Sequence, residues 1–210
     1  MEKLNIETWN RRQHFEFFNT FQDPFFAVTA PMDVTKAHDF AKASGNSFFA
    51  VYLHDCMKAI NAVEPFRYRI ENDNEVVIHD KIHASATIIR PDNTFGFSFI
   101  DYDEDFEVFK ENIAKEKERI LNTDDLFPPK NTEDCVFASA LPWVHFTGHK
   151  EPFHGKKESV PRFAFSKMEV VDNKKIMTVS VSVNHALMDG YHVGQFTEKF
   201  QEYLLNHEIS

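Results

Sequence analysis

The feature that most constrains the fold is a run near the C-terminus, residues 175–185, in which apolar and polar residues alternate strictly from Met177 to Asn184. Residues at every second position share one face of a β-strand. One face would carry Met177, Val179, Val181, Val183 and His185, and the other Thr178, Ser180, Ser182 and Asn184. Asp189-Gly190 then makes a turn into an amphipathic helix. This pattern predicts a sheet with a helix packed on its apolar face.

Further elements follow from helical and strand periodicity. We expect helices over 35–44, 47–63 and 106–121, and strands over 25–34, 66–70, 75–79, 84–90, 96–101, 135–140 and 162–170. Turn residues at 71–74 and 172–173 predict two hairpins. Because no repeat or linker interrupts the chain, residues 1–210 are expected to form a single domain. The expected fold is α/β (α+β-like): a two-layer sandwich whose mixed, largely antiparallel sheet is covered by helices.

Composition excludes several classes of protein. The net charge of −10 argues against nucleic acid or an anionic membrane as a partner. The N-terminus lacks the apolar segment of a signal peptide, and two cysteines outside any CxxC pattern are typical of a reduced cytoplasmic protein. Phenylalanine is unusually frequent, at 23 residues. Such rings need dry surroundings, in the core, in an apolar pocket or at a subunit interface.

His185 is the strongest candidate for chemistry. It continues the apolar face of its strand to the strand end, four residues before Asp189. Partial burial there favours the neutral imidazole that a general base requires. The alternative is a structural histidine at a strand end, because the spacing His-x-x-x-Asp-Gly is short enough to occur by chance.

A metal site is a competing interpretation of the histidines. His185 and Asp189 lie four residues apart, and His145, His149 and His154 are close together in one loop. Zinc needs three or four ligands in fixed geometry. A Thr-Gly pair between His145 and His149 makes a poor helix, so these two do not share a helix face. We therefore expect no metal ion.

Ser139 and Arg11 carry little signal when each is considered by itself. Ser139 would be an ordinary strand serine, since no Gly-x-Ser-x-Gly nucleophile elbow surrounds it. Arg11 would be a surface charge in a polar N-terminal segment. The six scattered glycines form no phosphate-binding loop.

Taken together, three motifs resemble those of the chloramphenicol acetyltransferase family. Residues 184–194, Asn-His-Ala-Leu-Met-Asp-Gly-Tyr-His-Val-Gly, are similar to the family's His-x-x-x-Asp-Gly signature. Residues 139–144, Ser-Ala-Leu-Pro-Trp-Val, resemble its Ser-Ala-x-Pro-Trp-Val element. Residues 9–15, Trp-Asn-Arg-Arg-Gln-His-Phe, resemble its N-terminal Trp-x-Arg-Lys-x-His-Phe element. The resemblance covers essentially the whole chain.

The resemblance implies direct acetyl transfer from acetyl-CoA to a hydroxyl group, without an acyl-enzyme. His185 would be the general base, with its other ring nitrogen bonded to its own backbone carbonyl. Ser139 would donate to the tetrahedral oxyanion. Asp189, paired with Arg11, would support the turn that holds His185.

The resemblance also implies a homotrimer with active sites between subunits, and chloramphenicol as acceptor, the chemistry of an antibiotic-resistance enzyme. Phe17 and Phe26 match aromatic residues of the acceptor pocket. Three positions depart from the family pattern. Asn184 stands in place of a histidine, Phe18 in place of a pocket tyrosine, and Ala164 in place of a threonine that positions a water.

Two other functions share some of these features. Dihydrolipoamide acyltransferase cores carry the same histidine signature, but they normally follow lipoyl and linker segments, which this chain lacks. A catalytically weak binding protein for an apolar ligand or CoA is the second alternative. The complete set of His185, Ser139, Asp189 and Arg11 argues against it.

Overall fold

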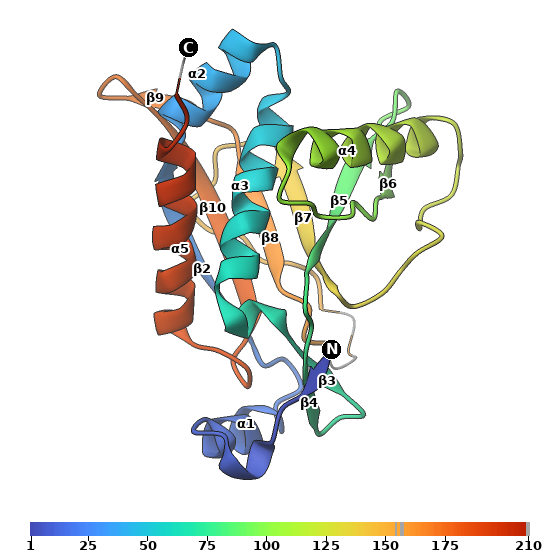
Figure 1. Cartoon of the computed structure of the whole chain (residues 1–210), viewed down its shortest axis with the longest axis vertical. Helices are drawn as coiled ribbons and strands as arrows, with labels where there is room; N and C mark the ends of the chain where they lie inside the picture. Colours follow the sequence, from blue (N-terminus) through green and yellow to red (C-terminus); the bar gives the residue numbers. More distant parts are fainter. Residues whose placement is uncertain (154, 156–157, 209–210) are drawn as a thin grey trace.

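The computed structural model describes residues 1–153, 155 and 158–208. Within them, a seven-stranded sheet has the order β2–β10–β8–β7–β5–β6, with β9 beside β10 (Figure 1). Its strands are β2 (Phe25–Asp33), β5 (His83–Ile89), β6 (Phe95–Phe97), β7 (Cys135–Leu141), β8 (Arg162–Ser166), β9 (Glu169–Val171) and β10 (Lys174–Asn184). Only β5–β7 and β7–β8 pair in parallel among these described strands. The expected mixed, largely antiparallel sheet is confirmed.

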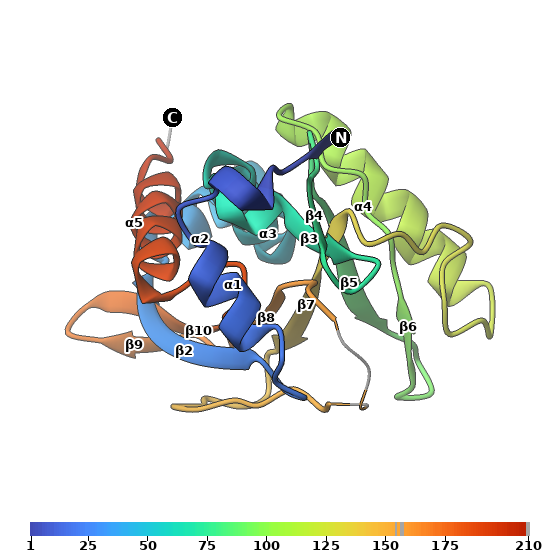
Figure 2. The same cartoon turned by 90° about the horizontal axis from the view of Figure 1, so that it is seen from below.

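Helices cover one face of this sheet. They are α2 (Thr35–Ser44), α3 (Phe48–Ala62), α4 (Phe106–Leu121) and α5 (Gly190–Leu205). In Figure 2 they lie above the strands, whereas the segment that follows β7 runs along the opposite face. A short helix, α1 (Arg12–Phe18), lies at the end of the sheet. The two faces therefore differ: one is packed on helices, and the other carries the polar residues of the alternating strand.

A second, three-stranded sheet lies at the same end as α1. It contains β1 (Glu2–Lys3), β3 (Tyr68–Glu71) and β4 (Glu75–Ile78), in the order β1–β4–β3. Two single 3-10 turns, η1 (Ile6–Thr8) and η2 (Glu64–Arg67), flank it. The expected strand from residue 66 therefore starts two residues late, because η2 occupies its first positions.

The apolar face of strand β10 forms part of the hydrophobic core, together with residues of α5. Val179, Val181 and Val183 are buried in the same cluster as Phe196 and Phe200 of α5. Full burial of such side chains stabilises the fold by roughly 1.5–3 kcal/mol each. The register of β10 is set by this face, since a slip by one residue would turn the valines toward the polar side.

Two expected strands are shorter than their apolar patterns. β6 ends at Phe97 because the Ser98 hydroxyl accepts from the backbone N–H of Ala86 and donates to its carbonyl, at 3.0 and 2.8 Å, interrupting the ladder. Ile100 still forms an isolated bridge to Ala84. The strand expected over 162–170 divides into β8 and β9.

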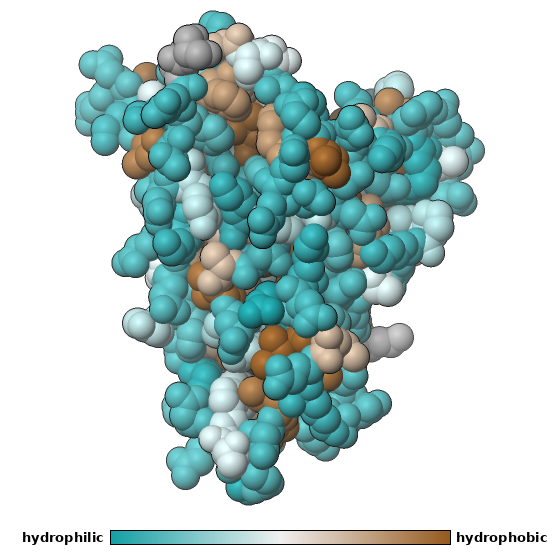
Figure 3. Space-filling model, in the orientation of Figure 1, coloured by the Kyte–Doolittle hydropathy of each residue, from teal (hydrophilic) through white to brown (hydrophobic). Residues whose placement is uncertain are grey.

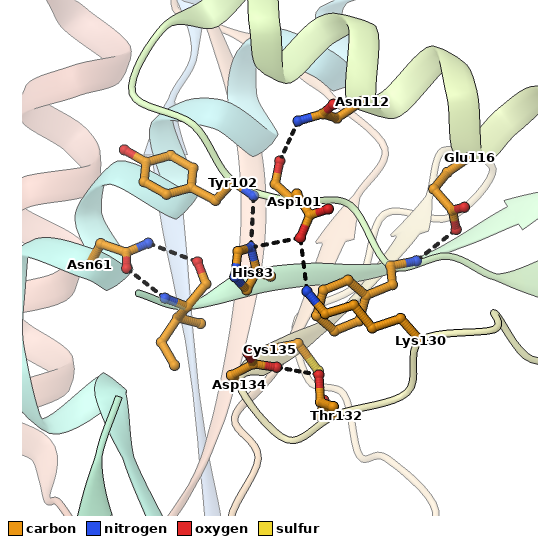
Figure 4. Close-up of polar contacts among 12 residues, drawn as sticks. Asn61, His83, Asp101, Tyr102, Asn112, Glu116, Lys130, Thr132, Asp134 and Cys135 are labelled. Carbon is orange, nitrogen blue, oxygen red and sulfur yellow. Dashed lines mark hydrogen bonds and ion pairs between the residues drawn. The ribbon is translucent and has the colours of Figure 1, made fainter. Parts of the chain in front are cut away.

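A polar network anchors the start of β5 to its neighbours (Figure 4). His83 Nδ1 accepts from the backbone N–H of Tyr102 at 2.9 Å. The Asp101 carboxylate lies 3.5 Å from the same nitrogen and 3.0 Å from Lys130 Nζ. Asn61 of α3 bonds both backbone groups of Ile82. Burial lowers the pKa of His83. A neutral ring that accepts from a backbone amide fits a structural role.

The helix-covered surface is mostly hydrophilic, with small separate hydrophobic patches at the top, at mid-height and near its lower end (Figure 3). No helix in the described part of the chain is long and apolar enough to cross a membrane.

Candidate active site

His185 lies at the first position beyond β10. Its backbone N–H donates to the Pro24 carbonyl at 2.9 Å, which continues the β2–β10 ladder by one bond. Its Nδ1 lies 3.1 Å from the carbonyl oxygen of Met188. Because a carbonyl only accepts, this contact requires the proton on Nδ1 and leaves the lone pair on Nε2 in the neutral ring. The expected bond to the histidine's own carbonyl is wrong: the turn brings the Met188 carbonyl to the ring instead.

Three phenylalanines from the N-terminal part of the chain surround or adjoin this ring. Phe18 is stacked on His185 with ring centroids 4.0 Å apart, and Phe26 contacts it at 4.6 Å. Phe17 packs edge-on against Phe18 but is itself 60% exposed. We call His185, Phe17, Phe18 and Phe26 the His185 cluster. The structure therefore brings together the predicted base and three of the four predicted pocket residues.

Arg11 and Asp189 form an ion pair beside the His185 cluster, and Arg11 also contacts the backbone of His185. The Arg11 guanidinium forms an ion pair with the Asp189 carboxylate, and its Nη2 donates to the His185 carbonyl at 3.3 Å. Asp189 also begins α5, accepting from the backbone N–H of Tyr191 at 3.0 Å. Burial raises the pKa of Asp189, but the bonds and charges of Arg11, His192 and Tyr191 outweigh it and lower that pKa below its usual value. The carboxylate is therefore ionised near neutral pH, as the pairing requires.

Ser139 lies elsewhere, on the polar face of the sheet. It pairs with Ala164 of β8, which pairs in turn with Ser180 of β10. Ser139 makes no side-chain hydrogen bond with any residue that the structure describes, so its hydroxyl is available as a donor.

Ser139 borders a cavity of about 290 Å³, which we call the Ser139 cavity. The cavity is lined by Ser85, Thr87, Phe97, Phe127, Asn131, Phe137, Ala138, Ser139, Glu151, Pro152, Glu158 and Arg162.

A second cavity, of about 410 Å³, meets the first at Ser139 and Thr87. We call it the Trp143 cavity, since Trp143 and Pro142 line its far side. Ser139 is thus accessible from two cavities, the geometry needed by a residue that acts on a bond formed between two substrates.

One chain does not bring Ser139 to His185. Ser180, in register with Ala164 and so with Ser139, lies five residues before His185 on β10. Five residues along a strand and two strand spacings across separate the two Cα atoms by on the order of 15–20 Å. Ala164, the fourth predicted pocket residue, stays with Ser139 and is only 1% exposed. The predicted site is therefore divided between two regions of the chain.

The charged side of the Ser139 cavity was missed by sequence reasoning. Arg162 pairs with Phe137 and Ser182, so it shares a sheet face with Ser139. The signal that could have revealed it is this register, which the sequence does not contain. Glu151 and Glu158 come from a loop without periodicity and gave no signal.

The histidines considered for metal binding are dispersed among other partners. His145 lies 3.4 Å from Glu169, and His149 lies 3.7 Å from Glu151. His154 lies outside the described residues. Within those residues, no group of three histidine, cysteine or carboxylate side chains could hold a metal ion.

Comparison with known proteins identifies relatives along the full chain. The family model described as chloramphenicol acetyltransferase matches residues 1–201. A chloramphenicol acetyltransferase of Clostridium perfringens is 29% identical over 211 residues, covering 98% of this chain and 95% of the relative. The one from Bacillus pumilus is 29% identical over 210 residues, with 99% and 94% covered.

Solved structures agree with these sequence relatives. A chloramphenicol acetyltransferase superposes with a TM-score of 0.85 at 26% identity, covering 96% of this chain and 99% of the other. The dihydrolipoamide acetyltransferase of Azotobacter vinelandii gives a TM-score of 0.68 at 15% identity, with 92% and 86% covered. At that identity, the second likeness shows a shared fold alone.

Proposed function

Because the chain belongs to the chloramphenicol acetyltransferase family, a family of acyltransferases, we propose that it moves the acetyl group of acetyl-CoA to a hydroxyl of chloramphenicol or a similar small apolar alcohol. The observation that carries the mechanism is the bond from His185 Nδ1–H to the Met188 carbonyl, which leaves Nε2 to act as a base.

The proposed reaction proceeds in one transfer. Nε2 of His185 removes the hydroxyl proton of the acceptor while the hydroxyl oxygen attacks the thioester carbonyl carbon. The tetrahedral intermediate carries negative charge on the former carbonyl oxygen, to which the Ser139 hydroxyl donates. Collapse breaks the carbon–sulfur bond, and the protonated His185 returns its proton to the sulfur of CoA. No acyl-enzyme forms.

The two cavities that meet at Ser139 suit the two substrates. We assign the acceptor to the Ser139 cavity, whose Phe97, Phe127 and Phe137 offer an apolar wall. The thioester of acetyl-CoA would approach through the Trp143 cavity, so that its carbonyl carbon meets the acceptor beside Ser139. No metal ion takes part in this scheme.

The separation of His185 from Ser139 supports a site shared by two subunits. In a closed three-fold ring, the His185 cluster of each copy can face the Ser139 cavity of the next, which makes three equivalent sites. The exposed rings of Phe17 and Phe21 would be buried by such contacts. We therefore propose a homotrimer. A cytoplasmic location fits its use of acetyl-CoA and the unpaired, buried Cys56 and Cys135.

Thiol release from acetyl-CoA tests this function. The purified protein is mixed with acetyl-CoA and either chloramphenicol or one of a panel of small alcohols, and mass spectrometry identifies the ester. We expect acceptor-dependent thiol release with chloramphenicol. Binding of chloramphenicol or CoA by calorimetry, without thiol release for any acceptor, would favour the alternative of a binding protein.

A further inference from the structure

The Ser139 cavity has two chemically different sides. On one side the rings of Phe97 and Phe127 are stacked, with centroids 5.5 Å apart and planes inclined by 21°, and Phe137 extends this wall. The other side carries Glu151, Glu158 and Arg162. A cavity for a purely apolar ligand would not need three charged groups, because burying them costs free energy that only polar partners recover.

The charge of Arg162 is already satisfied within the protein. Its guanidinium forms an ion pair with Glu158, donates to the Pro152 carbonyl at 3.1 Å and lies over the ring of Phe25 at 4.8 Å. The side chain is only 10% exposed. Arg162 therefore has little surface left for an anionic ligand and acts chiefly to hold Glu158 in place.

The carboxylate of Glu151 is less fully engaged. Among the described residues, its ionisable partner is His149, whose Nδ1 lies 3.7 Å away, beyond hydrogen-bond distance. Among the described residues that line the cavity, two carboxylates and one guanidinium give a formal excess of one negative charge. The whole chain, at −10, has the same sign. Both the wall and the field of the protein thus favour a cation or a strong hydrogen-bond donor.

We propose that the acceptor is an amino alcohol: its apolar or aromatic body lies on Phe97 and Phe127, its hydroxyl reaches Ser139, and its ammonium group binds the Glu151 carboxylate. This inference rests on the proposed function, because it takes the Ser139 cavity as the acceptor site. It makes Glu151 a residue that determines acceptor specificity. Chloramphenicol, which is uncharged, would lie on the same aromatic wall with its hydroxyl at Ser139 but would make no ion pair with Glu151.

A matched pair of acceptors tests the proposal. The free-amine form of chloramphenicol keeps the nitrophenyl ring and both hydroxyls but has an ammonium group in place of the amide. Its N-acetyl derivative has the same body without the charge. We expect kcat/KM for O-acetylation to be about tenfold higher for the amine, as one charge-assisted hydrogen bond provides. Mass spectrometry and NMR of the product separate O-acetylation from N-acetylation.

Substitution of Glu151 tests whether this residue causes the preference for the amine over the amide. Glu151→Gln keeps the size and hydrogen-bonding capacity of the side chain but removes its charge, so the ratio of the two kcat/KM values should fall to near one. Using a ratio cancels any general loss of activity. Glu118→Gln is the control: it removes the same charge from an exposed side chain of α4 that is not among the described lining residues of the cavity, and it should leave the ratio unchanged.

The outcomes separate this inference from the function on which it rests. Equal kcat/KM for amine and amide, or a preference that Glu151→Gln leaves intact, overturns the role of Glu151 while leaving acetyl transfer standing. No thiol release with any acceptor rejects the proposed function instead. Calorimetry on the amine and the amide still tests the cavity in that case, because the binding preference and its loss in Glu151→Gln do not depend on turnover.

Discussion

The imidazole of His185 lies flat against the ring of Phe18, with their planes only 10° apart and their centroids separated by 4.0 Å. Stacking fixes the plane of the imidazole, and the bond from Nδ1–H to the Met188 carbonyl fixes its rotation within that plane. Two elements far apart in the chain, α1 and the turn before α5, thus set the direction of Nε2 before any substrate binds. A base that is oriented in advance loses little free energy to reorganisation during the reaction.

Replacing His185 with alanine should abolish most activity. Loss of a general base typically costs ~10²–10⁴-fold in rate. The ring contributes to α1 packing, so the variant is checked by circular dichroism and thermal unfolding before kcat is measured by thiol release. A folded variant with most of its native kcat would contradict the proposed mechanism.

Ser139→Ala should lower kcat with little change in the KM for acetyl-CoA. Its hydroxyl would act on negative charge that exists only after attack, and loss of one oxyanion donor costs roughly 2.7–4 kcal/mol. Steady-state kinetics with acetyl-CoA varied at saturating acceptor separates the two parameters. A matched control is Ser85→Ala, which removes a hydroxyl from the same cavity. A rise in KM alone would make Ser139 a binding residue.

Mixed trimers test whether each site uses His185 from one subunit and Ser139 from another. Co-expression of His185→Ala and Ser139→Ala chains in equal amounts should restore about one quarter of native activity, because a site is intact when its two halves come from the right chains. Light scattering should give about 73.5 kDa, three times the chain mass of 24.5 kDa. No recovery of activity in verified hybrids would contradict a shared site.

The Arg11–Asp189 pair should contribute to stability above acidic pH. The side chains are 11% and 33% exposed, so we expect removal of one partner to cost about 1–3 kcal/mol, less than for a fully buried pair. The effects of Arg11→Ala and Asp189→Asn should be less than additive in the double variant, as measured by urea unfolding.

The pH dependence of the Arg11–Asp189 pair follows from the lowered pKa of Asp189. Because the folded pKa lies below the unfolded value of about 3.9, the stabilisation is complete above that pH and is lost as pH falls through the folded pKa. The difference in unfolding free energy between the native chain and Asp189→Asn should therefore shrink in acid. A constant difference would refute the pairing.

Periodicity predicted the helices and strands that local interactions stabilise. Where tertiary contacts determine whether an element forms or where it ends, periodicity did not predict it. The helix over 106–121 was predicted at its observed bounds, and the Asp105 side chain caps it by accepting from two backbone amides. The short helix α1 was not predicted, since its aromatic residues are stabilised by contacts with distant strands. Ser98 ended β6 through a side-chain bond to Ala86 that no local pattern encodes.

In the candidate site, too, local motifs predicted some features, whereas others depend on the packing of the whole sheet. Motifs predicted the candidate residues, and in the structure Arg11 contacts both Asp189 and the His185 carbonyl. They did not predict that one chain keeps Ser139 away from His185, because strand order and register are set by packing of the whole sheet. For the same reason Arg162 could not be placed beside Ser139 from sequence.

The final prediction concerns Phe18 and Ala164, two of the three positions that depart from the family pattern, which we expect to line the acceptor pocket. Phe18→Tyr keeps the stacking on His185 and adds a hydroxyl that can bond the acceptor. Ala164→Thr adds a hydroxyl beside Ser180, whose own hydroxyl is buried without a hydrogen-bond partner among the described residues. The bond that Phe18→Tyr makes to the acceptor is worth roughly 0.5–1.5 kcal/mol, so this substitution should lower the KM for chloramphenicol by about two- to tenfold in the double variant, whereas the bond of Ala164→Thr lies within the protein and acts on stability. Because Ala164 is tightly enclosed, thermal unfolding of each single variant is measured first. An unchanged KM in a stable double variant, with another alcohol acetylated readily by both proteins, would reject chloramphenicol as the acceptor for which this pocket is built.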